Sequence, residues 1–301
     1  MTTSIKTINS LINNDCKKFI ESSDKNFFNQ IKKAAETIYN QHNQTPIILI
    51  SGPSGSGKTT SATILKNILN DMGLNSHTIS LDNYFSPLSE EELKLLSEGK
   101  MDLESPDRID NDLLNQQIEK IINGEKVEIP TYDFKKSQRF YNGNFIQRKE
   151  NEIVIFEGIH ALNDNVITID DSKTFKIYVS VRTRVESGGI LMHPSKIRLL
   201  RRLIRDNIHR GRSADDTLQL FASVERGEHK YIMPYKKRSC FDIDTFIPYE
   251  ISVYKHFLEN NSMIIRHKTV TDDLLEILDK IKSIDTELIS KDSLIYEFVG
   301  E

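Results

Sequence analysis

PIILISGPSGSGKTT, residues 46–60, is the stretch that decides the fold of this chain. Its first six residues, PIILIS, are typical of a short apolar strand buried in a parallel sheet, and Gly52 ends that strand. A helix is predicted from about Thr59 to Met72. The residues between strand and helix fit G-x-x-x-x-G-K-[ST], a pattern whose physical role is to cradle phosphate groups. The sequence therefore predicts a phosphate-binding loop within an α/β fold.

The chemistry of this loop predicts a site for ATP with magnesium. Its glycines let backbone N–H groups point at phosphate oxygens, and the helix N-terminus adds the positive end of its dipole. Lys58 is expected to reach the β- and γ-phosphates, and the Thr59 hydroxyl to complete a Mg²⁺ shell that is otherwise water and phosphate. An accidental glycine-rich loop is the alternative, which the strand and helix in register disfavour. The predicted ATP-binding residues of the loop are Gly52, Pro53, Ser54, Gly55, Ser56, Gly57, Lys58, Thr59 and Thr60.

Composition limits the class of protein. The chain has 301 residues, 38% of them hydrophobic, which suffices for one large core. Its formal net charge is −4, whereas a nucleic-acid binder usually has a basic excess. Cys16 and Cys240 lie far apart, which argues against a disulfide framework or a structural zinc site and suits a reducing cytosol. No apolar run approaches the ~20 residues of a membrane helix, and the polar start is unlike a signal peptide, so we expect a cytoplasmic protein with no membrane or nucleic-acid partner.

Strand and helix patterns alternate along the rest of the chain. Further strands are predicted at His77–Leu81, Glu152–Phe156 and Phe175–Val181. Further helices are predicted at Glu90–Ser97, Asp110–Ile122, Pro194–His209, Ala214–Val224 and Asp272–Ile284. This alternation predicts a parallel sheet with helices on both faces. The stretch 132–148, with a turn signal at Asn142-Gly143, predicts a small β-hairpin beside the sheet.

The chain is predicted to have two parts. Residues 1–44 are polar with apolar residues at helical spacing, which predicts a helical N-terminal extension without chemistry of its own. Residues 45–301 form the domain that contains the phosphate-binding loop. The tail after about residue 283 carries no motif to which the sequence alone assigns a role.

Two acidic residues follow strands close to the loop. Asp82 ends the strand after the loop, and Glu157 ends the strand 152–156. In a parallel sheet, both carboxyl ends lie at the edge that holds the loop. Asp82 is placed to hold Mg²⁺ through water and to accept a proton from an attacking hydroxyl, the alternative being a simple Asx turn. Glu157 is costly on a buried strand unless a cation pairs with it, and Mg²⁺ or a structural Lys or Arg would serve.

The stretch Pro194–Arg212 is rich in arginine. An apolar stripe of Ile197, Leu200, Ile204 and Ile208 runs beside a basic stripe of Arg198, Arg202, Arg205 and His209, with Arg201 and Arg210 close by. Arginine suits phosphate because its planar fork binds oxygens bidentately and keeps its charge. We predict an Arg-rich helical lid, residues 183–213, that closes over the transferring phosphate, the alternative being a solvated charged face. Asp206 is expected to pair with one arginine and to hold this face rigid.

Together these motifs resemble the uridine kinase/phosphoribulokinase family of P-loop kinases. The matching stretches are GPSGSGKTT, SLDNYF, ESPDRID, IPTYDF, VIFEGIHAL and RRLIRDNIHRGR, in the family's order over about 46–250. The chain is more similar still to a bacterial subgroup of nucleoside kinases that often carries threonyl-tRNA-synthetase-like domains upstream. That likeness extends through VERGEHKYIMPYK, FIPYE and SLIYEFVG. We expect the upstream domains to be absent here and a helical lead-in to be retained.

The resemblance implies a P-loop kinase fold and roles for the matching residues. Asp82 would be the catalytic base, acting with Lys58. The residues near magnesium would be Thr59, Asp82 and Glu157. Arg205 and Arg210 would contact the phosphates of ATP. The residues that line the acceptor pocket would be Glu104, Tyr132, Phe134, Arg202 and Arg212.

Three positions depart from the uridine kinase pattern. Glu104 stands where the family has an aspartate that holds the ribose hydroxyls. Ser137 stands where it has a histidine that reads the pyrimidine edge, and Leu220 where it has a glutamine that faces the substrate. A site built to hydrogen-bond a base discriminates less when those partners are lost. The phosphate-transfer residues therefore match the family better than the base-reading residues do.

The expected function is that of an ATP- and Mg-dependent kinase that transfers the γ-phosphate to a hydroxyl of a small molecule. Uridine and cytidine are the leading acceptors, and a different hydroxylated acceptor is the first alternative. The second alternative is an ATP-binding regulatory protein without kinase activity, against which Asp82, Glu157 and the arginines of the lid count. Lys58 and Asp82 disfavour a dead scaffold. The expected partner is the small-molecule acceptor, and a homo-oligomer is compatible with the sequence.

Overall fold

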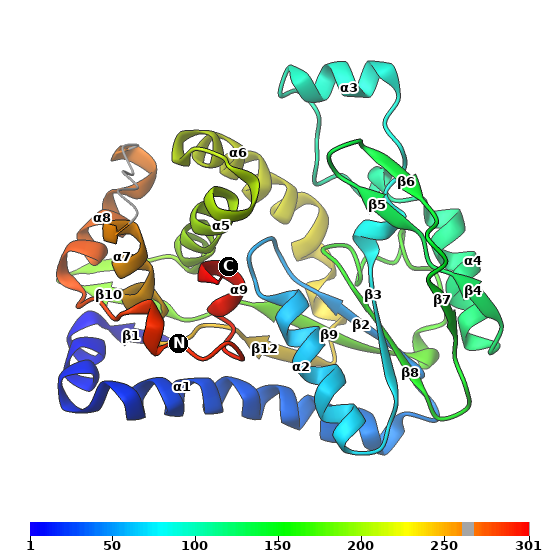
Figure 1. The fold of residues 1–301 in the computed structure, drawn as a ribbon, viewed down its shortest axis with the longest axis horizontal. Coiled ribbons are helices and arrows are strands. Elements are labelled where there is room, and N and C mark those ends of the chain that lie inside the picture. The colour runs from blue at the N-terminus through cyan, green and yellow to red at the C-terminus, as the bar shows by residue number, and fades with distance from the viewer. Residues whose placement is uncertain (261–267, 301) are drawn as a thin grey trace.

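A parallel sheet of five strands forms the centre of the computed structural model, which describes residues 1–260 and 268–300 (Figure 1). The strand order is β12-β9-β2-β8-β3. The strands are β2 (Ile47–Ser51), β3 (Ser76–Ser80), β8 (Ile153–Glu157), β9 (Thr174–Ser180) and β12 (Phe241–Asp244). Every residue of β2, β8 and β9 is buried, as expected of a parallel sheet that is covered on both faces. The predicted α/β fold is confirmed.

Helices cover both faces of this sheet. Helix α1 (Ile5–Gln41) packs against α2 (Lys58–Asp71) on one face, and α4 (Asn111–Ile122) lies on the other. Alternate residues of β2 enter the two cores. Ile48 and Ile50 join the core of α1 and α2, whereas Ile47 and Leu49 join that of α4. Successive side chains of a strand point to opposite faces of the sheet, so the single apolar run of β2 contributes to the core on both faces.

Helix α1 is part of the main core. It kinks at Asp15 (φ −163°, ψ 91°), where the carboxylate accepts a hydrogen bond from the backbone N–H of Lys18. Ile31, Ala34 and Ile38 are fully buried because apolar residues at three- and four-residue spacing share one helix face. The helix predicted within residues 1–44 is present, while the domain boundary near residue 44 stays a prediction.

A smaller sheet precedes the arginine-rich helix. It has the order β1-β10-β11 and consists of β1 (Thr2–Ser4), β10 (Arg184–Ser187) and β11 (Ile190–Met192). The predicted helical lid began at residue 183, so the structure corrects its first part to β-structure, which the parallel pairing of β10 with β1 fixes. The helical part is α5 (Pro194–Arg210), and Gly211 ends it in the left-handed conformation (φ +61°).

Two short antiparallel strand pairs lie beside the main sheet. They are β4 (Lys126–Glu128) with β7 (Phe145–Gln147), and β5 (Thr131–Asp133) with β6 (Gln138–Phe140). The predicted hairpin is β5–β6, but its turn spans 134–137, whereas Asn142-Gly143 only connects β6 to β7. Asp133 makes the observed turn, because its carboxylate accepts hydrogen bonds from the N–H groups of Lys135 and Lys136.

The remaining elements complete the layers. The other helices are α3 (Glu90–Ser97), α6 (Ala214–Gly227), α7 (Glu250–Asn260), α8 (Lys268–Lys280) and α9 (Tyr296–Val299). Single helical turns occupy Leu81–Tyr84, Pro106–Arg108, Asp171–Lys173, Glu228–Ile232, Met233–Arg238 and Thr286–Leu288. Each helix predicted after the loop has an observed counterpart: Glu90–Ser97 has the predicted bounds, and the others have shifted ends. In the described ranges, no helix combines the length and the apolar character that crossing a bilayer requires.

Candidate functional site

The phosphate-binding loop connects β2 to α2, and close backbone contacts hold it. A Cβ atom on Gly52 would lie 2.0 Å from the carbonyl oxygen of Val179 in β9. Gly55 and Gly57 have φ values of +73° and +83°, in the left-handed region that favours glycine. A side chain at Gly52 would clash with β9, and side chains at Gly55 and Gly57 would strain the backbone, so the loop requires glycine at these positions.

Lys58, Asp82 and Glu157 face one another at the carboxyl edge of the sheet. Lys58 opens α2, and its Nζ donates a hydrogen bond to the carbonyl oxygen of Pro53 at 3.2 Å. Burial lowers the pKa of Lys58, while the carboxylates of Glu157 and Asp82 raise it. Enclosure by protein raises the pKa of Asp82, and the ammonium of Lys58 lowers it. The structure thus brings together the three residues that the sequence analysis placed at this edge.

The oxygen atoms near the loop fit a hard divalent cation. Thr59 Oγ1 lies 3.4 Å from Glu157 Oε1, and Glu157 is 6% exposed. Burial raises the pKa of Glu157, and Lys58 lowers it. Among residues 1–260 and 268–300, no three His, Cys, Asp or Glu side chains are arranged to hold a metal by themselves. Magnesium bound here would therefore take ligands from water and phosphate as well, which is its usual preference.

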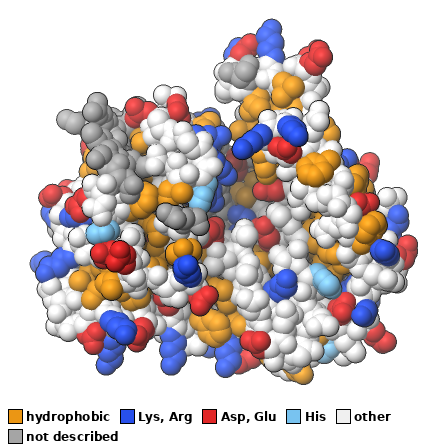
Figure 2. Space-filling view, viewed as in Figure 1, with side chains coloured by type: hydrophobic (Ala, Val, Ile, Leu, Met, Phe, Trp, Pro, Cys, Tyr) orange, Lys and Arg blue, Asp and Glu red, His pale blue; other side chains and the backbone are white. Residues whose placement is uncertain are grey.

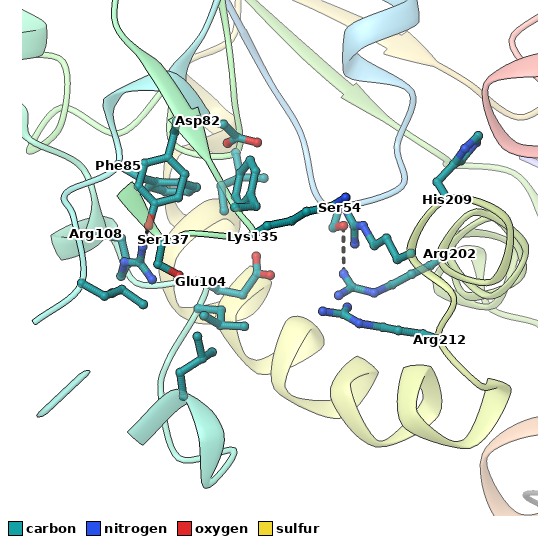
Figure 3. A pocket seen from close by; sticks show the side chains of 17 residues that line it. Ser54, Asp82, Phe85, Glu104, Arg108, Lys135, Ser137, Arg202, His209 and Arg212 are labelled. Atoms are coloured by element: carbon teal, nitrogen blue, oxygen red, sulfur yellow. Dashed lines mark hydrogen bonds between the residues drawn. The ribbon is translucent and has the colours of Figure 1, made fainter. Parts of the chain in front are cut away.

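Buried arginines of helix α5 donate hydrogen bonds to the phosphate-binding loop. Arg201 is fully buried and binds both carboxylate oxygens of Glu250, at 2.7 and 3.0 Å. The same guanidinium donates to the Gly55 carbonyl oxygen at 3.1 Å. Arg202 Nη1 donates to Ser54 Oγ at 3.0 Å, the dashed line in Figure 3. The sequence analysis missed the pair of Arg201 with Glu250, because an arginine stripe looks the same whether it meets a buried acid or solvent.

Asp206 holds the arginines of α5 as a group. Its carboxylate is fully buried and lies 2.8 Å from Arg210 Nη1 and 3.5 Å from nitrogen atoms of Arg202 and Arg212. The predicted pairing with one arginine therefore extends to three. Arg210 and Arg205 also lower the pKa of Asp82, so both guanidinium groups act on the carboxyl predicted to be the base.

A cavity of about 770 Å³ opens beside the loop. Figure 2 shows the molecule hollowed between its two lobes, with Lys and Arg side chains on one wall. The predicted residues that line this cavity are Ser54, Asp82, Glu104, Tyr132, Phe134, Arg202, Arg210 and Arg212. Ser137, Phe85, Arg108, Lys135 and His209 line it as well. Leu220 does not: it lines a neighbouring cleft together with residues of α6 and the α3 loop.

Aromatic rings form the wall opposite the arginines. Phe85, Tyr132 and Phe134 meet edge to face with centroids 5.1–5.9 Å apart. Arg108 lies over Phe85 at 5.2 Å and donates to the Tyr132 hydroxyl at 3.2 Å. Phe85 and Arg108 were not predicted as site residues. Both sit in stretches that matched the family pattern, SLDNYF and ESPDRID, which is the signal that pointed to them.

Glu104 points into the cavity from the loop before Pro106–Arg108 (Figure 3). Its carboxylate Oε2 is buried without a hydrogen-bond partner, and burial raises its pKa while Arg202 lowers it. Its carbonyl oxygen lies 3.0 Å from Nε2 of His160, a buried histidine whose pKa burial lowers to about 4. A Cβ atom on Gly227 would lie 2.3 Å from Glu104 Cβ, so α6 backs this residue closely. The Glu104 carboxylate therefore stands at the cavity wall, with Oε2 shielded from solvent and without a hydrogen-bond partner.

The C-terminal tail also reaches the loop, which the sequence analysis did not predict. Leu294 packs on Gly57, and the carboxylate of Glu297 accepts a hydrogen bond from Thr60 Oγ1. Leu294 and Glu297 belong to the stretch SLIYEFVG, which is similar to the bacterial subgroup but to which the sequence alone assigns no role.

Comparisons with known proteins place the chain among small-molecule kinases. The sequence profile of the Phosphoribulokinase / Uridine kinase family matches residues 47–247. A uridine kinase from Staphylococcus epidermidis is 35% identical over 211 residues, covering 68% of this chain and 88% of that protein. A uridine kinase from Staphylococcus aureus is 35% identical over 198 residues, covering 64% and 84%. In fold, the chain is similar to YFH7 from Saccharomyces cerevisiae, a circularly permuted P-loop-containing protein, with a TM-score of 0.53 and 10% identity over 71% of this chain and 96% of that one. These relatives give no support to the expected link with synthetase-like domains.

Proposed function

This chain belongs to the Phosphoribulokinase / Uridine kinase family, and we propose that it transfers the γ-phosphate of ATP to a hydroxyl group of a nucleoside. Family membership makes it a phosphotransferase that acts on a hydroxyl group. One observation carries the finer proposal. Asp82 lines the same cavity as Ser54 of the phosphate-binding loop and interacts electrostatically with Lys58. This position supports Asp82 as the base that would act between the phosphate donor and the acceptor.

The reaction would use Asp82 as the base. Its carboxylate takes the proton of the acceptor hydroxyl as the hydroxyl oxygen bonds to the γ-phosphorus and the bond to the β–γ bridging oxygen breaks, releasing ADP. Desolvation raises the pKa of Asp82, and a raised pKa favours proton uptake by its carboxylate. Lys58, Arg205 and Arg210 would offset charge on the phosphates. Thr59, Asp82 and Glu157 would hold magnesium directly or through water, and the ion would supply further charge neutralisation when bound.

A nucleoside suits the remaining cavity wall. The edge-to-face aromatic group of Phe85, Tyr132 and Phe134 offers apolar surface to a planar base. The carboxylate of Glu104, which lines this cavity, would accept hydrogen bonds from sugar hydroxyls. The relatives named uridine kinase make uridine the first acceptor to test. Ser137 stands where the family has a histidine that reads the base, and Arg108 lines the same cavity. Because that histidine is absent, a different hydroxylated acceptor is the second candidate.

The test is Asp82→Asn measured against the unsubstituted chain. Purified protein receives Mg-ATP with uridine, cytidine, other nucleosides, ribose-type sugars or pantothenate, and ADP release is compared with a no-acceptor control. We expect one class of acceptor to accelerate ADP release, and Asp82→Asn to lower kcat by about 10²- to 10⁴-fold while ATP affinity is kept. Asp71→Asn, at an exposed position at the far end of α2, is the matched control.

Two outcomes would contradict the proposal. If no acceptor accelerates ADP release in protein that binds ATP, the chain is an ATP-binding regulatory protein. If Asp82→Asn turns over like the Asp71→Asn control, the base is a different group.

A further inference from the structure

The C-terminal tail ends against the nucleotide loop. After α8 the chain returns across the molecule, so that α9 lies beside α5 and close to the loop that precedes α2 (Figure 1). Leu294, Ile295 and Phe298 are fully buried. We call residues 293–298 the tail segment. Its side chains contact Gly57 and Thr60, two of the residues predicted to bind ATP.

Two apolar side chains of the tail segment support the special glycines of the loop. Leu294 Cδ1 would lie 2.6 Å from a Cβ atom on Gly57, so the leucine packs directly on this left-handed residue. The Phe298 ring lies 5.1 Å from the guanidinium carbon of Arg201, which donates to the carbonyl oxygen of Gly55. The tail segment therefore contacts Gly57 directly and Gly55 through one intermediate side chain.

Glu297 adds charge to this contact. Its carboxylate accepts a hydrogen bond from Thr60 Oγ1 and lies 4.0 Å from Arg205 Nη1. Burial and then the neighbouring Arg210 lower the pKa of Arg205, and Glu297 is the first of the acids that raise it. Glu297 thus offsets the repulsion between two guanidinium groups that both act on Asp82.

The contact with Glu297 does not saturate the guanidinium of Arg205. Arg205 Nη1 lies 4.0 Å from Glu297 Oε1, so the ion pair is long rather than bidentate. Glu297 occupies only the side-chain hydroxyl of Thr60 and leaves the backbone N–H groups at the start of α2 available. This arrangement orients the cationic groups and still leaves room for a phosphate on them.

The tail segment is anchored at its start. Ser293 Oγ lies 2.9 Å from the Tyr249 hydroxyl and donates to Asp24 Oδ1 of α1 at 3.0 Å. Ser293 is 5% exposed, so these bonds are shielded from water. Glu297 therefore extends from a fixed backbone, as preorganised binding requires.

We propose that the tail segment is a wall of the nucleotide site and that Glu297 is a positioning residue, which holds Thr60 and Arg205 for the phosphates of ATP. The inference rests on the proposed function in one respect, the binding of ATP at the loop. It does not depend on which acceptor is used.

The test is Glu297→Gln, with the dissociation constant of a slowly hydrolysed Mg-ATP analogue measured by calorimetry. Glutamine keeps the shape and a hydrogen-bond acceptor for Thr60 but loses the charge that Arg205 faces. We expect ATP binding to weaken about tenfold, with the melting temperature of the nucleotide-free protein unchanged. Asp292→Asn, an exposed acid of the same tail, is the matched control and should leave the affinity unchanged.

A double-mutant cycle tests the route through Arg205. In an Arg205→Gln background, Glu297→Gln should cost little further affinity, because the group that it positions is gone. Unchanged affinity in the single variant would overturn the proposal and leave Glu297 a packing residue. Tighter binding would also overturn it, because the carboxylate would then compete with phosphate. Failure of the unsubstituted chain to bind the analogue would overturn the proposed function together with this inference.

Discussion

At the scale of single residues, the site is built from carboxyl groups that the protein makes costly to ionise. Glu157 is the clearest case, since it is 6% exposed at the end of a fully buried strand. Burial raises its pKa above the usual glutamate value of 4.5, although Lys58 opposes this. Burial of the Glu157 carboxylate lowers the free energy of unfolding, and a cation bound beside it restores that stability.

Glu157→Gln should change how stability depends on pH. Because the pKa of Glu157 is raised in the folded state, its favourable contribution is complete below pH 4.5 and is lost as the pH rises through the raised value. Glutamine does not ionise, so the variant does not lose stability in this way as the pH rises. Relative to the unsubstituted chain, its free energy of unfolding should increase as the pH rises from 4.5 through the raised pKa, measured by urea unfolding with chelator and without nucleotide.

The control for this measurement is Glu150→Gln, at an exposed position in the loop before β8. Its unfolding curve should keep a constant offset from that of the unsubstituted chain. Parallel curves for Glu157→Gln as well would mean that ion pairing with Lys58 fully offsets the burial of the carboxylate.

At the scale of elements, α5 is both a core helix and the support of the loop. Its apolar residues Ile197, Leu200 and Ile204 are fully buried, and so is Arg201 between them. A mobile lid would keep its charges in solvent, whereas here the guanidinium of Arg201 bonds to Glu250 and to Gly55. The helix therefore combines a fixed first half with the more exposed Arg210 at its end.

Arg201→Met should destabilise the protein by about 3–5 kcal/mol, because it leaves the carboxylate of Glu250 buried without its partner. Urea unfolding at neutral pH is the measurement. Adding Glu250→Gln to this variant should recover part of the loss, since no buried charge is then left unpaired. If the double variant is less stable than Arg201→Met, the carboxylate of Glu250 contributes mainly through its bond from the N–H of Ile247.

At the scale of the whole molecule, a hydrogen-bonded group joins both ends of the chain to its centre. The Tyr249 hydroxyl donates to Asp24 Oδ1 at 2.7 Å and lies 2.9 Å from Ser293 Oγ. Asp24 belongs to α1, Tyr249 precedes α7, and Ser293 begins the tail segment. Burial raises the pKa of Asp24, and the two hydroxyl groups lower it. The N-terminal helix is thus connected to the tail by named bonds rather than by proximity alone.

Tyr249→Phe should therefore lower stability by about 1–3 kcal/mol, because it removes a donor from a half-buried carboxylate. Thermal unfolding near neutral pH is the measurement. Tyr39→Phe is the control and should have little effect, because this tyrosine of α1, the helix that contains Asp24, is 40% exposed. A loss no larger than in the control would show that Asp24 is adequately solvated without the tyrosine.

Sequence reasoning predicted the parts of the fold whose signals are local. The loop and the strands β2, β8 and β9 carry apolar runs and glycines that need no knowledge of distant residues. Strand β12 escaped prediction because its four residues include two aspartates, and only pairing with β9 makes it a strand. The hairpin turn was misplaced because the side chain of Asp133 competes successfully with the stronger-looking Asn142-Gly143 signal.

The site was predicted as far as motifs reach. Lys58, Asp82 and Glu157 follow from their places after strands, and the lining of the cavity by Glu104 and Tyr132 follows the resemblance. The contact of Glu297 with Thr60 joins residues 237 positions apart, and no periodicity encodes such a contact. Leu220, which stands where the family has a glutamine that faces the substrate, lines a neighbouring cleft and not this cavity.

The position of the last described residues has a practical consequence for handling the protein. Gly300 is buried, and α9 before it lies against α5 beside the nucleotide loop. An affinity tag, a fluorescent fusion or a surface-immobilisation linker joined at this end would crowd the place where ATP is expected to enter. Met1 is 94% exposed, and its carbonyl oxygen accepts a hydrogen bond from the backbone N–H of Arg184 at the start of β10. Labels for biosensor or single-molecule work therefore belong at the amino end.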